Sequence, residues 1–234
     1  MMKGSFDMKI LLPADCGVVL DLDDTLYPER DYLRSGYQAI VETLPVDVRE
    51  NALEQMLVWW NSGVPDVLQR AIATFPFAHG LGELLEIYRY HPPSISLRGG
   101  ANELLQAIKK NGVPIGLITD GRARTQRAKL EALGLTGFFD VEIISEELGS
   151  EKPELRNFQA LMHQLDAQRY MYIADNTRKD FIGPNQLGWM SICLLDEGGN
   201  IHQQQFDGPT ASLPSVCIDR LSLDNFCFPV DLSP

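Results

Sequence analysis

The stretch Val18-Val19-Leu20-Asp21-Leu22-Asp23-Asp24-Thr25 contains the pattern that decides the fold. Its first three residues are apolar and two of them are β-branched, which is typical of a buried strand. Polar residues begin directly afterwards at Asp21, so the strand is expected to end in a polar loop. In an open parallel sheet, ligands bind beyond the carboxyl ends of the strands. Asp21 and Asp23 therefore mark the expected position of a functional site.

The chain beyond residue 98 alternates between predicted helices and predicted strands. Helices are expected over residues 101–110, 124–133, 156–165 and 183–188, and strands over 114–118, 141–145, 170–174 and 191–195. This alternation indicates crossover connections and a parallel sheet that is covered by helices on both faces. We therefore predict an α/β fold with a doubly wound, Rossmann-like parallel sheet. Residues 196–213 are expected to form a polar loop, and residues 216–218 a last edge strand.

A helical segment interrupts this pattern between residues 29 and 93. Apolar residues recur there at the three-to-four spacing of helices over residues 32–44, 48–60, 67–75 and 81–90. Proline and glycine, which end helices, separate these stretches. The sequence therefore predicts a small all-α domain over residues 29–93, inserted into a core domain made of residues 1–28 and 94–234.

The composition is that of a globular chain. It has 234 residues, of which 44% are hydrophobic and 22% charged, so there is enough apolar material for a core. The net charge of −12 repels phosphate backbones and anionic lipids, so we expect neither a nucleic acid polymer nor a membrane as partner. The four cysteines form no C-x-x-C pair, which argues against a zinc or redox motif. No stretch approaches the roughly 18 apolar residues of a membrane span, and we expect a cytoplasmic protein.

Polar residues follow several of the predicted strands at the point where each strand ends. Because the carboxyl ends of parallel strands share one edge of the sheet, these side chains are expected to converge. Crowded carboxylates repel one another unless a cation lies among them, and oxygen ligands of this kind suit Mg²⁺ bound together with a phosphate. The residues are Asp21 and Asp23, then Thr119, Asp120 and Gly121, then Glu146 and Glu147 with Lys152 behind them, and finally Asp175 and Asn176.

This set of residue types suits phosphoryl transfer. An aspartate can attack phosphorus to form an aspartyl-phosphate, and a second carboxyl group can protonate the leaving oxygen and later activate water. Taken singly, each residue has a structural alternative. Thr119 or Asp120 can cap the helix expected after Arg122, Lys152 can be a solvated side chain, and Asp175 with Asn176 can form a turn. Their shared position after strands of one sheet favours a site.

At this point the sequence resembles the haloacid dehalogenase superfamily, over residues 18–190. Residues 18–26 look like its first motif, 117–121 like its second, 149–153 like its third, and Ile173-Ala174-Asp175-Asn176 with Asp180 like its fourth. Two departures are small: Ala174 stands where glycine is common, and Pro184 where a small residue is usual. The resemblance also identifies residues 29–93 as a helical cap that closes over the core.

The resemblance implies a role for each matched residue. Asp21 is then the nucleophile and Asp23 the general acid/base, while Thr119 holds the phosphoryl group and Lys152 steadies both nucleophile and phosphate. Magnesium is the implied cofactor, with Asp180 in its outer shell. Its ligands are expected to be Asp21, the backbone carbonyl of Asp23, Asp175 and, as a further candidate, Asn176. The residues expected around the substrate phosphate are Leu22, Asp120, Gly121, Arg122 and Lys152.

Within the family, Asp23 resembles the phosphatase pattern, because the dehalogenases lack an aspartate there. A phosphonatase would need a cap lysine, and the chain has no lysine between Lys9 and Lys109. We expect a magnesium-dependent phosphomonoester hydrolase acting on a sugar phosphate, a sugar-acid phosphate or a nucleoside monophosphate. A phosphosugar mutase and a non-catalytic, metabolite-binding descendant are the alternatives, and the oligomeric state is open. Candidates for lining the cleft are Tyr27, Arg30, Arg34, Tyr37, Trp59, Trp60, Arg122 and Arg124, although the tryptophans can equally form the helical domain's interior.

Overall fold

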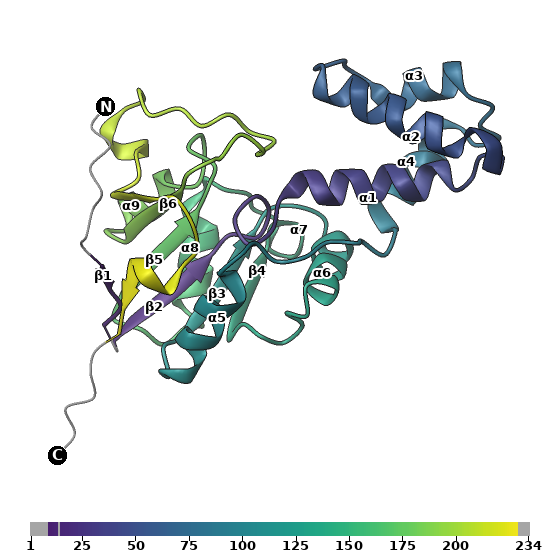
Figure 1. Ribbon diagram of the computed structural model, residues 1–234. Helices are drawn as coiled ribbons and strands as arrows, with labels where there is room; N and C mark the ends of the chain where they lie inside the picture. Colours follow the sequence, from purple (N-terminus) through teal and green to yellow (C-terminus); the bar gives the residue numbers. More distant parts are fainter. Residues whose placement is uncertain (1–8, 14, 229–234) are drawn as a thin grey trace.

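A parallel sheet of six strands forms the centre of the molecule, in the order β4-β3-β2-β5-β6-β7. The computed structural model describes residues 9–13 and 15–228 (Figure 1). All five strand pairings in this sheet are parallel, so the predicted α/β fold is confirmed. The strands are β2 (Cys16–Leu20), β3 (Ile115–Thr119), β4 (Val141–Ile144), β5 (Arg169–Ala174), β6 (Met190–Leu194) and β7 (Val216–Ile218).

The first strand of this sheet, β2, lies in its middle. All five of its residues are buried, which explains the unbroken apolar run in the sequence. The chain adds β3 and β4 on one side of β2, and β5, β6 and β7 on the other. Strand order therefore reverses at β2, and the crevice at such a reversal is where doubly wound sheets bind their ligands.

Helices cover both faces of the sheet. On one face, α5 (Ala101–Lys110) and α6 (Ala123–Ala132) contribute Leu104 and Leu130 to a cluster that also contains Val18 and Leu20. On the other face, α8 (Leu155–Met162) contributes Phe158 to a second cluster, beside the short helix α9 (Ile182–Gln186). The alternating faces of β2 thus enter two separate apolar layers, as the pleat of a strand requires.

Three features near the sheet differ from the sequence prediction. Strand β4 ends at Ile144, and Ser145–Leu148 forms a short helix, α7, where the strand was expected to continue into a loop. Two short strands, β1 (Ile10–Leu11) and β8 (Phe226–Cys227), pair with each other outside the main sheet. The predicted loop over residues 196–213 holds one 3₁₀ turn, η1 (Thr210–Ser212), and a second, η2 (Leu223–Asn225), precedes β8. Residues 1–8, 14 and 229–234 of the predicted core domain lie outside the described residues.

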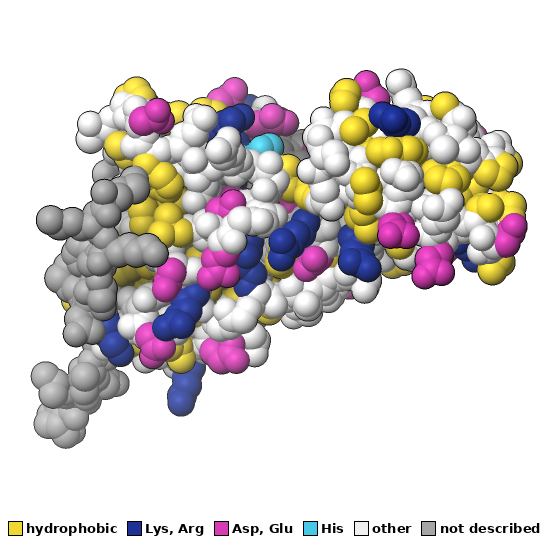
Figure 2. All heavy atoms as spheres, turned by 45° about the horizontal axis from the view of Figure 1, so that its top comes forward, with side chains coloured by type: hydrophobic (Ala, Val, Ile, Leu, Met, Phe, Trp, Pro, Cys, Tyr) yellow, Lys and Arg dark blue, Asp and Glu magenta, His cyan; other side chains and the backbone are white. Residues whose placement is uncertain are grey.

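The inserted segment forms four helices with an apolar cluster of their own. These helices are α1 (Glu29–Val41), α2 (Val46–Asn61), α3 (Val67–Thr74) and α4 (Leu81–Tyr90), and their cluster includes Ile40, Met56 and Leu84. Figure 2 shows this helical block as a separate lobe with apolar, acidic and basic side chains mixed over its visible face. Within residues 9–13 and 15–228, no helix combines the length and the apolar character needed to cross a membrane. The exact division into two domains stays a prediction.

Candidate active site

A polar cavity of about 100 Å³ lies where the central strands end. Asp21 and Asp23 follow β2, Asp120 follows β3, and Asp175 follows β5. The sheet therefore brings the ends of three neighbouring strands to one space, as the sequence predicts. The full lining consists of Asp21, Asp23, Asp24, Glu29, Asp120, Lys152, Asp175, Lys179 and His202.

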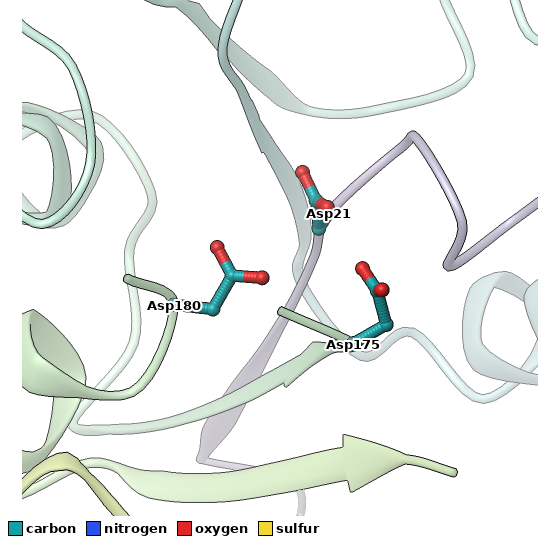
Figure 3. A group of neighbouring side chains, drawn as sticks. All are labelled: Asp21, Asp175 and Asp180. Carbon is teal, nitrogen blue, oxygen red and sulfur yellow. The ribbon is translucent and has the colours of Figure 1, made fainter. Parts of the chain in front are cut away.

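Three buried aspartates lie close together at this edge of the sheet. Oxygen atoms of Asp21, Asp175 and Asp180 all lie within 4.8 Å of one another. Figure 3 shows Asp21 and Asp175 at the ends of neighbouring strands, with Asp180 turned toward them from the following loop. Asp180 is held in place because its Oδ2 accepts a hydrogen bond of 2.9 Å from the backbone N–H of Asn176. Asp175 Oδ2 accepts one of 2.8 Å from the side-chain amide of Asn200.

Lys152 is the buried cation of this group. Its Nζ donates to Asp21 Oδ1 at 2.7 Å and to the hydroxyl of Tyr172 at 3.1 Å, and it lies 2.8 Å from Asp180 Oδ1. Burial disfavours the charged lysine, but Asp180 and Asp21 outweigh it and raise the pKa of Lys152 well above its usual range. The lysine predicted from the third motif is therefore in contact with the predicted nucleophile.

One lysine does not compensate three carboxylates. Burial raises the pKa of Asp21 to about 7, even though Lys152 opposes the shift. Burial also raises the pKa of Asp175 to about 9, and the neighbouring Asp180 and Asp21 add to that shift. A buried set of hard oxygen donors with excess negative charge fits a divalent cation of the Mg²⁺ type. The residues present thus satisfy the chemistry of the metal that the sequence resemblance implies.

Asp23 has different surroundings from Asp21, although only Leu22 separates them. Its Oδ1 accepts a hydrogen bond of 2.6 Å from Lys129 Nζ and a short one from the hydroxyl of Tyr27, and its Oδ2 accepts one of 2.9 Å from the amide of Gln126. Burial would raise the pKa of Asp23, but Lys129 and these hydrogen bonds hold it below its usual value. The two aspartates of the first motif therefore differ in their proton affinity, and Asp23 is the one more readily ionised in the free protein.

The second motif is only partly at the cavity. Thr119 is buried at the end of β3, and its hydroxyl accepts a hydrogen bond of 2.5 Å from Gln126. Asp120 lines the cavity, where its Oδ1 accepts from the backbone N–H of Lys152 at 3.0 Å and its Oδ2 pairs with Lys179 at 2.5 Å. Gly121 has a φ of +137°, which favours glycine, and its N–H donates to the hydroxyl of Ser145. Neither Thr119 nor Asp120 caps α6, so that alternative is wrong.

Three of the predicted residues, Arg122, Glu146 and Glu147, lie outside the cavity. Arg122 is half-exposed beside Glu146, 4.0 Å away, in a separate hollow outside the cavity. Glu146 and Glu147 belong to α7: the first accepts the backbone N–H of Ala123 at the start of α6, and the second pairs with Arg127. The expectation that both glutamates join the strand-end cluster is wrong, because the chain turns into a helix at Ser145.

Two further predicted residues have other contacts. The side chain of Leu22 is fully buried in the apolar core, so its expected contact with the phosphate can involve only its backbone. The side-chain oxygen of Asn176 accepts a hydrogen bond of 3.1 Å from the backbone N–H of Arg178, as in a turn. Of the cleft candidates, Tyr27 is bonded to Asp23, Trp59 and Tyr37 belong to the interior of the helical block, and Arg124 stacks on Tyr90.

Three residues of the cavity lining, Glu29, Lys179 and His202, were not predicted from the sequence and do not lie at strand ends. Glu29 is the first residue of α1, and it lines the cavity. Lys179 and His202 complete the lining, the second from the loop over residues 196–213. Glu29 follows the first motif closely, which was an available signal. His202 is separated from every motif, and its sequence neighbourhood contains none.

Comparisons with known proteins agree with this geometry. Residues 17–188 match the family model described as haloacid dehalogenase-like hydrolase. The chain is 28% identical to a glyceraldehyde 3-phosphate phosphatase of Methanopyrus kandleri over 75% of this chain and 82% of that protein. It is also 28% identical to a ribulose-1,5-bisphosphate 5-phosphatase of Halopiger xanaduensis, with the same coverage.

Solved structures show the same fold. The magnesium-bound HAD hydrolase YfnB of Bacillus subtilis superimposes with a TM-score of 0.63 at 18% identity, over 88% of this chain and 94% of that one. The family model covers most of the core and the whole helical block, including all four strand-end motifs. The chain therefore belongs to the family of haloacid dehalogenase-like hydrolases.

Proposed function

We propose that this hydrolase is a phosphatase of small phosphomonoesters that uses Asp21 as its nucleophile and Mg²⁺ as its cofactor. The observation that carries the proposal is the pairing of Asp21 with Lys152 at 2.7 Å, beside a second, differently held aspartate two residues away. A nucleophilic carboxylate next to a fixed cation is what formation of an aspartyl-phosphate requires. The relatives that act on sugar phosphates support the same reaction.

In the proposed first step, an Asp21 oxygen bonds to phosphorus and the bond from phosphorus to the leaving oxygen breaks. Asp23, whose pKa rises when a negatively charged phosphate lies beside it, gives a proton to that leaving oxygen. In the second step, Asp23 accepts a proton from water, whose oxygen attacks the aspartyl-phosphate and releases phosphate and free Asp21. Asp23 then carries the proton needed for the next ester. Water and ester are consumed, and an alcohol and phosphate are formed.

The other residues of the site hold charge and position. Lys152 orients Asp21 and offsets negative charge on the transferring group, and the hydroxyl of Thr119 donates to a phosphoryl oxygen. Mg²⁺ would be held by Asp21, Asp175 and the backbone carbonyl of Asp23, with Asp180 in its outer shell and Asn176 as a further candidate ligand. It would supply positive charge at the phosphoryl oxygens. Asp120 holds the loops of Lys152 and Lys179 together.

The size of the cavity and the names of the relatives support a proposal for the substrate class. A polar space of about 100 Å³ accommodates a phosphate group with little else, so the leaving group extends toward the helical block. The block begins at Glu29, a cavity residue, which suits a cap over residues 29–93 that closes on the substrate. We infer that a small sugar phosphate is the substrate, and that sugar-acid phosphates and nucleoside monophosphates are the competitors to be compared.

The test is phosphate release from a panel of these esters, with p-nitrophenyl phosphate as the generic member. We expect release with Mg²⁺, loss of release with a chelator, and a decrease of roughly 1000-fold or more in Asp21→Asn. Asp47→Asn, which changes an exposed aspartate on α2, is the matched control and should retain full activity. Turnover by Asp21→Asn at the wild-type rate would contradict the mechanism. Formation of an isomerised sugar phosphate without release of inorganic phosphate would favour a mutase. The absence of any reaction would favour a metabolite-binding protein.

A further inference from the structure

A buried lysine on α6 contacts the predicted acid/base from outside the four motifs. The side chain of Lys129 is 5% exposed, and its Nζ lies 2.6 Å from Asp23 Oδ1. It is enclosed by aromatic rings, with the Tyr32 ring centre at 4.4 Å and the Tyr27 ring centre at 5.9 Å. Tyr32 belongs to α1, so Lys129 lies between the core and the helical block.

The same helix holds the other oxygen of Asp23. Gln126, one turn before Lys129, donates its amide to Asp23 Oδ2 at 2.9 Å and to the hydroxyl of Thr119 at 2.5 Å. Both oxygens of Asp23 are therefore bonded to side chains of α6, and its carboxylate plane is fixed. Through Gln126, the hydroxyl proposed to bind the phosphoryl group is fixed to the same helix.

Stability alone does not account for this arrangement. Placing a lysine and an aspartate in a protein interior costs desolvation that a well-packed apolar pair of similar volume would avoid. The remaining apolar side chains of α6, such as Leu130, already anchor the helix in the core. The buried ion pair between Lys129 and Asp23 is therefore best explained by the acid/base role proposed for Asp23.

We propose that Lys129, together with Gln126, is a positioning residue for the acid/base Asp23. The inference rests on the proposed phosphatase function and adds a residue that the four motifs do not contain. Lys129 holds Oδ1 and Gln126 holds Oδ2, so the carboxyl group keeps one orientation toward the leaving oxygen and then toward the attacking water. Proton transfer requires this orientation to be correct within hydrogen-bond reach.

The first test compares two esters that differ in their need for a proton. The alcohol of glycerol 3-phosphate leaves only when it is protonated, whereas p-nitrophenolate leaves without a proton. In Lys129→Met we expect kcat for glycerol 3-phosphate to fall on the order of 100-fold with little change in KM. With p-nitrophenyl phosphate, phosphoenzyme formation should be spared, and phosphoenzyme should accumulate after acid quench because water activation is slow. Gln126→Leu should change the same rates in the same direction. Because it keeps the buried ion pair, it provides the test if Lys129→Met fails to fold.

Controls separate positioning from folding. Lys110→Met, which changes an exposed lysine at the end of α5, should behave as wild type. Lys129→Arg keeps the charge and should recover much of the lost rate. The double variant Asp23→Asn, Lys129→Met should be no slower than Asp23→Asn alone, because Lys129 acts through Asp23. Equal losses in the rate of phosphoenzyme formation from both esters, or additive losses in the double variant, would overturn the inference.

A stability cycle distinguishes failure of this inference from failure of the proposed function. The unfolding free energies of wild type, the two single variants and the double variant give the coupling between Asp23 and Lys129 without any substrate. A coupling near zero overturns the inference whatever the activity. A clear coupling in a protein that turns over neither ester instead overturns the proposed function, and the catalytic role of Lys129 with it.

Discussion

At the scale of single residues, the site is an assembly of like charges that the fold holds together. Asp21, Asp175 and Asp180 are buried within reach of one another, and Lys152 is the cation in contact with two of them. Such an arrangement is costly while all the carboxylates are ionised. The raised pKa values of Asp21 and Asp175 express that cost, and binding of a divalent cation would remove it.

The first prediction concerns pH and magnesium. Burial raises the pKa of Asp21 to about 7 and that of Asp175 to about 9, from 3.8 in an unfolded chain. The folded protein thus binds these protons more tightly, and the stability they contribute, complete below pH 3.8, is lost as pH rises toward 9. Metal-free protein should therefore melt at a lower temperature at pH 9 than at pH 6. Mg²⁺ competes with the protons, so its stabilising effect should grow with pH.

The measurement is thermal unfolding at both pH values, with Mg²⁺ and with a chelator. At ten times its dissociation constant, Mg²⁺ should add about 1.4 kcal/mol. Asp175→Asn should remove most of the pH dependence and weaken the Mg²⁺ effect. A stabilisation by Mg²⁺ that is equal at pH 6 and pH 9, or larger at pH 6, would show that these carboxylates are not the ligands.

Site residues that directly follow strands could be predicted from the sequence. The residues that contact them from other elements could not. Asp21, Thr119 and Asp175 follow from one rule, because parallel strands end at one edge of the sheet. Lys129 lies within a helix. The periodicity of the sequence indicates which side of the helix Lys129 is on, but it does not indicate that this side contacts the carboxylate of Asp23. The prediction for Arg122 failed for a related reason. Its positive charge suits a phosphate, but the sequence does not reveal that its side chain lies beside Glu146.

At the scale of elements, the loop over residues 196–213 contributes more to the site than its sequence suggests. Asp196 Oδ1 accepts hydrogen bonds from the backbone N–H groups of Gly198, Gly199 and Asn200 and so folds the loop into a tight turn. This turn brings the amide of Asn200 to Asp175 Oδ2 at 2.8 Å, while Arg98 donates to the other end of the same amide at 3.0 Å. The glycines of this loop predict a turn. The contact of the turn with Asp175, which follows β5, depends on long-range packing and could not be predicted.

The second prediction tests this loop. Asn200→Leu has a similar volume but leaves one oxygen of Asp175 without its hydrogen bond, so Asp175 should lose its orientation. Substitutions of this kind typically weaken metal binding by about 10- to 100-fold. The Mg²⁺ concentration for half-maximal activity, and the Mg²⁺ dissociation constant from calorimetry, should both rise by that factor. Asn51→Leu on the exposed face of α2 is the control, and unchanged Mg²⁺ binding in Asn200→Leu would refute the role of the loop.

At the scale of the whole molecule, Asp24 joins three segments that are distant in the sequence. Its carboxylate accepts the backbone N–H of Glu29 at 2.8 Å, where the helical block begins, and the backbone N–H of Ile201 at 2.7 Å, in the loop above the site. Arg98, where the chain returns from the block, donates to the backbone carbonyl of Asp24 at 2.8 Å. Figure 1 shows α1 running from the core into the helical block. The sequence predicted the block and the core separately, but it did not predict the residue that fixes one to the other.

The last prediction separates the two properties of Asp24, its carboxylate and its backbone. Its φ of +53° is unusual for any residue but glycine. Asp24→Ala loses two hydrogen bonds to a buried carboxylate and keeps the backbone strain, so it should lower the unfolding free energy by about 3 kcal/mol. Asp24→Gly loses the same hydrogen bonds but adopts this backbone readily, and should be about 1 kcal/mol more stable than the alanine variant. Urea unfolding followed by circular dichroism measures both. Activity should fall equally in the two variants, because the block and the loop are released in each; if glycine restored activity as well as stability, the backbone of Asp24 rather than its carboxylate would be what joins the molecule.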